Sequence, residues 1–297
     1  TPDTSHARLA PDVGVATVEF LRAHKVSRVI ITSPVYAGFW HWLEELDIEI
    51  VDVPLTSDFR LDTDGIEREF ANGIGHLLLC NPHNPLGRVF TRDELLALAD
   101  AADRHNAVVI ADEIHAPLTY PGTEFVPYLS LGPAAERTGV LVTSTSKSWN
   151  LAGLKAAFIH GHGERGAELL KPLPEAMHWR SSILGAFSMS VAYRDGIQWL
   201  DSTLDTLAIA RDHLASELQR LLPAAHLEMI PEAGYLAWVE ISGLNLGAKP
   251  WDRILEEGRV SVVPGTELGP QYTQHIRINF ATSPELITQA LTRIASI

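Results

Sequence analysis

Residues 140–159, VLVTSTSKSWNLAGLKAAFI, place one lysine, Lys147, between two apolar runs. The first run has the composition of a buried strand, and hydroxyl side chains at positions 144, 145, 146 and 148 surround the lysine. A lysine is rarely buried without a partner, because its ammonium group loses its hydration there. The fold and the function can therefore be inferred from the strands and the polar side chains that lie next to this amine.

The chain before this stretch alternates short apolar runs with helical patterns. Thr91 and Glu94 form a capping box at the start of one such helix, TRDELLALADAADRH, at 91–105. The runs are apolar nearly throughout, which is typical of strands covered by helices on both faces. We therefore predict an α/β fold with a mainly parallel sheet. The expected strands are VSRVIIT (26–32), IEIVDVPL (48–55), HLLLC (76–80), AVVIAD (107–112) and GVLVTST (139–145).

The last third of the chain has a different pattern. A long helical stretch at 198–222 leads into four short apolar runs, and a closing helix follows at 284–297. This order predicts a smaller α+β C-terminal domain with an antiparallel sheet. We place the domain boundary near residue 200, which gives a large domain at 1–200 and a small domain at 201–297. The four runs are HLEMI (226–230), GYLAWVEI (234–241), VSVVP (260–264) and HIRINFA (275–281).

Charge and cysteine content narrow the class of partner. The net charge of -14 argues against nucleic acid or an anionic membrane, since both require basic surface. The single cysteine, Cys80, excludes an internal disulfide and fits a reducing, cytoplasmic setting. No apolar stretch has the length needed to span a bilayer. HGHGER at 160–165 lacks supporting ligands, so we expect a polar turn there and no metal site.

Polar side chains follow three of the expected strands. HLLLC leads to Asn84, AVVIA leads to Asp112 and His115, and VLVT leads to Lys147. In a parallel sheet, binding groups lie in the crevice beyond the carboxyl ends of the strands. We therefore expect an amide, a carboxylate and a lysine at the same edge of the sheet.

This combination suits pyridoxal phosphate (PLP). The cofactor requires an amine for its aldehyde, an acid for its ring nitrogen and donors for its phosphate. Lys147 would form the Schiff base, and Asp112 would keep the pyridine nitrogen protonated. The lysine then tolerates burial because its charge is lost in the imine. The remaining donors are expected to be Ser144 and Ser146 for the phosphate, and Asn84 and His115 for the phenolate oxygen.

Three motifs also resemble a known family. NPHNPLGR (81–88), ADEIH (111–115) and TSTSKSWNLAGLK (143–155) resemble the fold-type I PLP enzymes of the class I/II aminotransferase superfamily. The resemblance is nearest to the cystathionine β-lyase (C–S lyase) branch, and it extends from about residue 8 to the C-terminus. IRINFATSP at 276–284 contributes the carboxylate-binding arginine of the superfamily at Arg277.

The resemblance implies further roles. Tyr36 would stack on the cofactor ring, although core packing is the alternative, and Arg277 would bind the substrate α-carboxylate. The backbone N–H groups of Asp12 and Val13 would face the phosphate at a helix start. Lys155 stands where relatives usually have a phosphate-binding arginine. A lysine cannot form the bidentate contact of a guanidinium, so Lys155 is either a single-point phosphate contact or a solvated surface charge.

The leading functional prediction is a C–S β-lyase. It would convert cystathionine or cysteine S-conjugates, as small-molecule substrates, to pyruvate, ammonia and a thiol. His115 supports this branch, because aminotransferases of the superfamily usually have a tyrosine there. The alternative is an aminotransferase that uses the same residues, and a second alternative is a PLP-binding regulatory protein. The resemblance also implies a homodimer.

Overall fold

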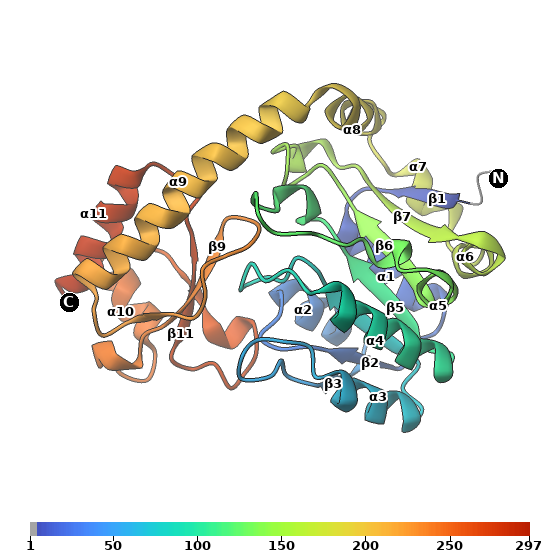
Figure 1. Cartoon of the computed structure of the whole chain (residues 1–297), viewed down its shortest axis with the longest axis horizontal. Coiled ribbons are helices and arrows are strands. Elements are labelled where there is room, and N and C mark those ends of the chain that lie inside the picture. The colour runs from blue at the N-terminus through green and yellow to red at the C-terminus, as the bar shows by residue number, and fades with distance from the viewer. Residues whose placement is uncertain (1–4) are drawn as a thin grey trace.

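The computed structural model describes residues 5–297, and two sheets organise the chain (Figure 1). The larger sheet has seven strands in the order β1-β7-β6-β5-β4-β2-β3. Strands β2 to β6 pair in parallel, whereas β7 pairs antiparallel with both β6 and β1. The predicted α/β fold with a mainly parallel sheet is confirmed. The strands are β1 (Ser5–Ala10), β2 (Arg28–Ile31), β3 (Glu49–Asp52), β4 (His76–Cys80), β5 (Val108–Asp112), β6 (Gly139–Thr143) and β7 (Ala157–His162).

Helices cover both faces of this sheet because alternate strand residues point to opposite sides. In β4, Leu78 and Cys80 pack into one core, and Leu77 and Leu79 pack into the other. The predicted capping box is present, with the Glu94 N–H donating to Thr91 Oγ1 at 3.3 Å. On the first face lie α1 (Val13–Ala23), α2 (Ala37–Glu45), α6 (Gly163–Leu170) and α7 (Glu175–Trp179), and on the second lie α3 (Thr63–Ala71), α4 (Arg92–Arg104) and α5 (Pro133–Thr138).

The edge strand β1 and its neighbour β7 were not predicted from the sequence. The expected polar turn at 160–165 is wrong, because β7 continues to His162 and α6 begins at Gly163. Pairing with β6 on one side and with β1, which is distant in sequence, on the other extends this segment. Within residues 5–297, no group of His, Cys, Asp or Glu side chains could hold a metal ion.

The smaller sheet belongs to the C-terminal part of the chain. Its order is β10-β11-β9-β8, with every pair antiparallel, as the sequence predicted. Helix α9 begins at Ile197, close to the expected domain boundary, which stays a prediction. From there α9 runs from the large sheet to the small one (Figure 1). The elements are α8 (Ile183–Asp195), α9 (Ile197–Leu221), β8 (His226–Leu227), β9 (Leu236–Glu240), α10 (Pro250–Glu256), β10 (Val263–Pro264), β11 (His275–Asn279) and α11 (Pro284–Ala295).

The helices are too short or too polar to span a bilayer in the part of the chain that the structure describes. Even α9, with 25 residues, has acidic side chains along its exposed side, including Asp201, Asp205 and Asp212.

Candidate functional site

The carboxyl ends of β4, β5 and β6 meet at one cavity of about 200 Å³, which we call the strand-end cavity. The register places Cys80 beside Asp112, and Asp112 beside Val142. Because the three strands are adjacent and parallel, the polar residues that follow them converge. The cavity is lined by Val13, Tyr36, Cys80, Asn84, Asp112, Ile114, His115, Lys147, Tyr235, Leu236, Arg277 and Asn279.

Asp112 is the buried acid of this cavity. It is the last residue of β5 and is 5% exposed. Burial raises the pKa of its carboxyl to about 6. The N–H donated by Ile114 at 3.1 Å and the charge of Lys147 act in the opposite direction and lower this pKa, but their effect is smaller. A buried carboxylate is stabilised by a cation that binds against it, and a protonated pyridine nitrogen is such a cation.

Arg277 and Asn84 connect the two sheets across the cavity. Arg277, on β11, donates from Nη1 to Asn84 Oδ1 at 3.1 Å. This bond occupies the amide oxygen of Asn84 and leaves its Nδ2 as a donor for another group. Burial lowers the pKa of Arg277, so its guanidinium also favours an anionic partner such as a carboxylate.

His115 and Tyr36 line the same cavity with their rings. Burial, with the charges of Lys147 and Arg277, lowers the pKa of His115 to about 3. Its imidazole is therefore neutral near pH 7 and offers one N–H donor. The Tyr36 ring packs edge-on against Phe39, with centroids 6.0 Å apart, so its position is fixed by α2.

A second cavity, of about 540 Å³, adjoins the first at Lys147 and lies at the start of α1; we call it the α1 cavity. Its lining includes Asp12, Val13, Ser146 and Lys155. Asp12 caps the helix by accepting from the Val15 N–H at 2.8 Å. Lys155 Nζ lies 3.4 Å from Asp12 Oδ2, and its side chain is 62% exposed. A helix N-terminus with a nearby cation favours an anion such as phosphate.

The two serines before Lys147 differ in their surroundings. The Ser144 hydroxyl is buried and donates to the Ala156 carbonyl at 2.6 Å. It also accepts from the Ser146 backbone N–H at 3.1 Å, and the two hydroxyl oxygens are 2.6 Å apart. Ser146 lines the α1 cavity, whereas Ser144 holds the loop to the chain at Ala156.

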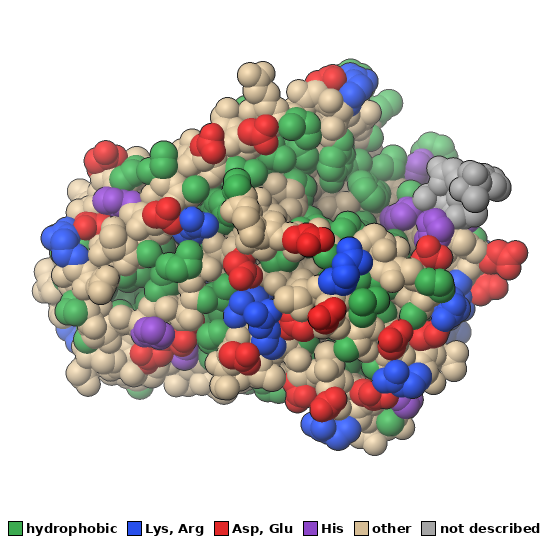
Figure 2. Space-filling model, in the orientation of Figure 1, with side chains coloured by type: hydrophobic (Ala, Val, Ile, Leu, Met, Phe, Trp, Pro, Cys, Tyr) green, Lys and Arg blue, Asp and Glu red, His purple; other side chains and the backbone are tan. Residues whose placement is uncertain are grey.

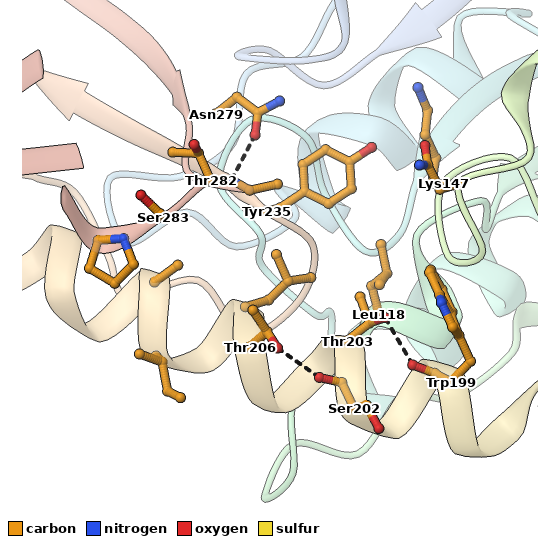
Figure 3. A pocket seen from close by; sticks show the side chains of 16 residues that line it. Leu118, Lys147, Trp199, Ser202, Thr203, Thr206, Tyr235, Asn279, Thr282 and Ser283 are labelled. Atoms are coloured by element: carbon orange, nitrogen blue, oxygen red, sulfur yellow. Dashed lines mark hydrogen bonds between the residues drawn. The ribbon is translucent and has the colours of Figure 1, made fainter. Parts of the chain in front are cut away.

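A third cavity, of about 820 Å³, runs along α9, and we call it the α9 groove (Figure 3). It meets the strand-end cavity at Lys147, Tyr235 and Asn279, which line both. Figure 3 shows the Tyr235 hydroxyl directed toward Lys147. The groove is lined by Leu118, Lys147, Asn150, Trp199, Ser202, Thr203, Thr206, Leu207, Ile209, Ala210, Tyr235, Asn279, Ala281, Thr282, Ser283 and Pro284.

Five residues that line the strand-end cavity had no predicted role in the site: Cys80, Ile114, Tyr235, Leu236 and Asn279. Asn279 follows Arg277 by two positions on β11, and the period of a strand was a usable signal for it. Tyr235 had no such signal, because only the docking of β9 places it beside His115, with ring centroids 5.8 Å apart. Cys80 was interpreted as a small buried residue; it is buried, and it also lines the strand-end cavity.

The residues present fit PLP. Asp112 offers a buried carboxylate, Asn84 keeps an amide donor in Nδ2, and Lys147 supplies an amine at the junction of the cavities. The adjoining α1 cavity combines a helix start with Ser146 and Lys155, as a phosphate requires.

Comparisons with known proteins agree with this arrangement. Residues 12–294 match the aminotransferase class I and II family. A cystathionine β-lyase of Corynebacterium glutamicum is 39% identical over 271 residues, which cover 91% of this chain and 72% of the relative. A putative cystathionine β-lyase of Mycobacterium tuberculosis is 35% identical over 320 residues, covering 99% and 78%. The crystal structure of a putative PLP-dependent β-cystathionase from Corynebacterium diphtheriae superimposes with a TM-score of 0.91 at 31% identity, covering 100% and 78%.

The chain therefore belongs to the aminotransferase class I and II family, whose members are PLP-dependent enzymes. Within that family, its relatives include proteins named cystathionine β-lyase.

Proposed function

We propose that this protein is a PLP-dependent C–S lyase that cleaves cystathionine or cysteine S-conjugates to pyruvate, ammonia and a thiol. The observation that carries the proposal is the convergence of Lys147, Asp112 and the Arg277–Asn84 pair on one cavity. The relatives named cystathionine β-lyase support this choice of reaction over others in the family.

The chain's own residues divide the binding of the cofactor. Asp112 would hold the ring nitrogen, and Asn84 Nδ2 with the neutral His115 would donate to the phenolate oxygen. Tyr36 would cover the ring from the start of α2. The phosphate would lie in the α1 cavity, against the N–H groups at the start of α1, Ser146 and Lys155. Ser144 would act through Ser146, because its own proton is donated to the Ala156 carbonyl.

When bound, PLP supplies an electron sink that stabilises negative charge at the substrate Cα. Arg277 would hold the substrate α-carboxylate through a charge-assisted pair. Lys147, at the junction of the cavities, is placed to remove the Cα proton as a general base. The Cβ–S bond then breaks, sulfur leaves with the electron pair, and Lys147 returns a proton to it. Water then hydrolyses the C–N bond of the remaining fragment, so that the three carbons leave as pyruvate and the amino group leaves as ammonia.

The experiment is incubation of the PLP-loaded protein with L-cystathionine, alone and with a 2-oxo acid. A lyase releases thiol and pyruvate without the 2-oxo acid. An aminotransferase releases neither, and instead converts the 2-oxo acid to an amino acid. The Lys147→Ala variant is the control: it is expected to lose roughly 10²- to 10⁴-fold in rate, as loss of a general acid–base group does. Unchanged turnover in this variant would refute the assignment.

We also infer that the protein works as a homodimer. Apolar side chains on α7, α8 and the first turn of α9 are exposed, and Figure 2 shows hydrophobic side chains gathered in this region. Monomers rarely expose a large contiguous apolar patch. Because Trp199 belongs to this face and also lines the α9 groove, a second copy bound here would lie beside the site. The face, called the α8 face, consists of Trp179, Ile183, Leu184, Phe187, Ile197 and Trp199.

Sedimentation velocity tests the dimer. The wild-type protein is expected to sediment as a dimer, and Phe187→Glu, which places a charge on the α8 face, is expected to sediment as a monomer. Leu255→Glu is the matched control, because Leu255 is exposed on α10 and lies outside this face. An active wild-type monomer at assay concentrations would contradict the inference.

A further inference from the structure

We propose that the α9 groove binds the substituent carried by the substrate sulfur and selects uncharged substituents over charged ones. This inference rests on the proposed C–S lyase function. The groove begins at Lys147, where the Cα and Cβ atoms react, and continues past Tyr235 and Asn279 onto α9 (Figure 3). A substituent that extends away from the reacting carbons enters this volume of about 820 Å³.

The groove offers no cation to a distal carboxylate. Among its lining residues in the described chain, Lys147 is the only lysine, arginine or acidic residue, and it serves the reacting carbons. Arg211, the next residue on α9 after the lining Ala210, is engaged elsewhere. Its guanidinium lies 2.8 Å from Asp212 Oδ1 and 4.4 Å from the centre of the Tyr120 ring.

The hydroxyl groups on the α9 wall are already committed as donors. Thr203 donates to the Trp199 carbonyl at 2.9 Å, and Thr206 donates to the Ser202 carbonyl at 2.9 Å. Ser202 in turn donates to the Gln198 carbonyl at 3.0 Å. Each hydroxyl oxygen keeps only lone pairs for a ligand. These lone pairs accept from neutral donors and repel a carboxylate.

Another wall of the groove, at the start of α11, ends at Pro284, and the next residue, Glu285, is an acid. The Glu285 carboxyl accepts from its own backbone N–H and from the Ser283 hydroxyl, and these bonds lower its pKa. The Leu286 N–H donates to Ser283 Oγ at 3.4 Å. The positive end of the helix dipole therefore already faces an anion. A second carboxylate in the groove would add a like charge beside Glu285.

Apolar side chains complete the groove. Leu118, Leu207 and Ile209 line it together with the Trp199 ring, and burying alkyl or aryl surface against them is favourable. The substrate class is therefore a cysteine S-conjugate with an uncharged alkyl, aryl or hydroxyl-bearing substituent. Cystathionine differs, because its four-carbon substituent ends in a zwitterion whose carboxylate would lose hydration with no cation beyond Lys147 among the lining residues.

The first test compares two substrates with four-carbon substituents, S-butyl-L-cysteine and L-cystathionine, on the PLP-loaded wild-type protein. The kcat/KM for S-butyl-L-cysteine is expected to be roughly tenfold higher, because the charged substituent is left unpaired. Equal values, or a preference for L-cystathionine, would overturn the proposal.

A charge placed in the groove tests where the substituent lies. Thr206→Lys puts an ammonium on the exposed α9 wall, and Thr206→Gln is the matched neutral control of similar length. The lysine is expected to move the ratio of the two kcat/KM values toward L-cystathionine by roughly two- to fivefold, the size of an exposed ion pair. A ratio that does not move, or that moves equally with glutamine, would overturn the placement.

Binding without cleavage separates this inference from the proposed function. L-2-Aminooctanoate and 2,7-diaminooctanedioate replace the sulfur of the two substrates with carbon, so neither can lose a thiol. Calorimetry is expected to give roughly tenfold tighter binding of L-2-aminooctanoate, and the reverse order would overturn the inference. S-Methyl-L-cysteine, whose substituent is too short to use the groove, reports the reaction itself. If none of the three cysteine derivatives yields pyruvate and thiol, the lyase function fails while the binding comparison still tests the groove.

Discussion

The strand-end cavity and the α9 groove share Lys147, yet they are built in opposite ways. The cavity is enclosed by the ends of parallel strands and holds Asp112 and Arg277, whose pKa values are shifted by burial. The groove is open, comes mainly from the C-terminal third, and has hydroxyl groups bonded to their own helix. An unpaired charge in the strand-end cavity costs free energy, so its ionisable groups have shifted pKa values and favour binding of oppositely charged groups. Such groups are typical of catalytic sites, and we therefore assign the reaction to this cavity. Recognition of varied substituents belongs to the groove.

The largest expected difference between the regions is in the rate of reaction. Asp112→Asn removes the buried carboxylate that we propose as the partner of the pyridine nitrogen, and it is expected to lower kcat by roughly 10²- to 10³-fold, as the loss of a buried charge-stabilising group does. Thr206→Asn, in the groove, should leave kcat for S-methyl-L-cysteine within about twofold, since an exposed substitution of this kind is near neutral. Steady-state pyruvate release with saturating PLP measures both rates. Equal rates for Asp112→Asn and wild type would contradict the assignment of the reaction to the strand-end cavity.

Stability against pH in the cofactor-free protein sharpens the same contrast. The pKa of Asp112 is about 6, raised by burial, so its contribution is fully present below pH 4 and is lost as pH rises through 6. Asp112→Asn is expected to remove that loss, which amounts to roughly 2 to 3 kcal/mol of unfolding free energy. Urea unfolding of both proteins at pH 4, 5, 6 and 7 gives the difference. A constant difference across this range would show that Asp112 does not titrate there.

Substrate anchoring is expected to give a smaller effect. Arg277→Lys keeps the charge but removes the planar fork, so KM should rise roughly tenfold and kcat should fall less. Arg211→Lys is the matched control, because Arg211 pairs with Asp212 and lines neither cavity. An unaltered KM in Arg277→Lys, with PLP still bound, would move the α-carboxylate site elsewhere.

The smallest effect is expected at the exposed corner of the α1 cavity. Lys155 pairs with Asp12 at 3.4 Å while most of its side chain is exposed, and such pairs contribute little. Lys155→Ala should change the unfolding free energy by less than about 0.5 kcal/mol and weaken PLP binding by less than about tenfold. Fluorescence titration of the cofactor-free protein with PLP measures the second value. If Lys155→Ala weakened PLP binding by 100-fold or more, Lys155 would be a major phosphate contact and the prediction of a small effect would be wrong.

The sequence was most informative where one element determined the outcome. The apolar runs before Asn84, Asp112 and Lys147 form adjacent parallel strands, so their polar successors meet at one edge. The capping box at Thr91 was predictable for the same reason, since its bonds are made within one helical turn. Strands β1 and β7 were missed because they pair with each other from distant parts of the chain, and no motif within either segment reports that pairing.

The sequence by itself therefore determined the α/β fold, the strand-end residues and the family resemblance, because periodicity and local motifs are written within single elements. Only the tertiary structure decided that Arg277 donates to Asn84, that Tyr235 lies beside His115, and that the Ser144 proton is held by the Ala156 carbonyl. It also decided the neutral character of the α9 groove. These features join segments far apart in the chain, and their geometry depends on how the two sheets and α9 pack together.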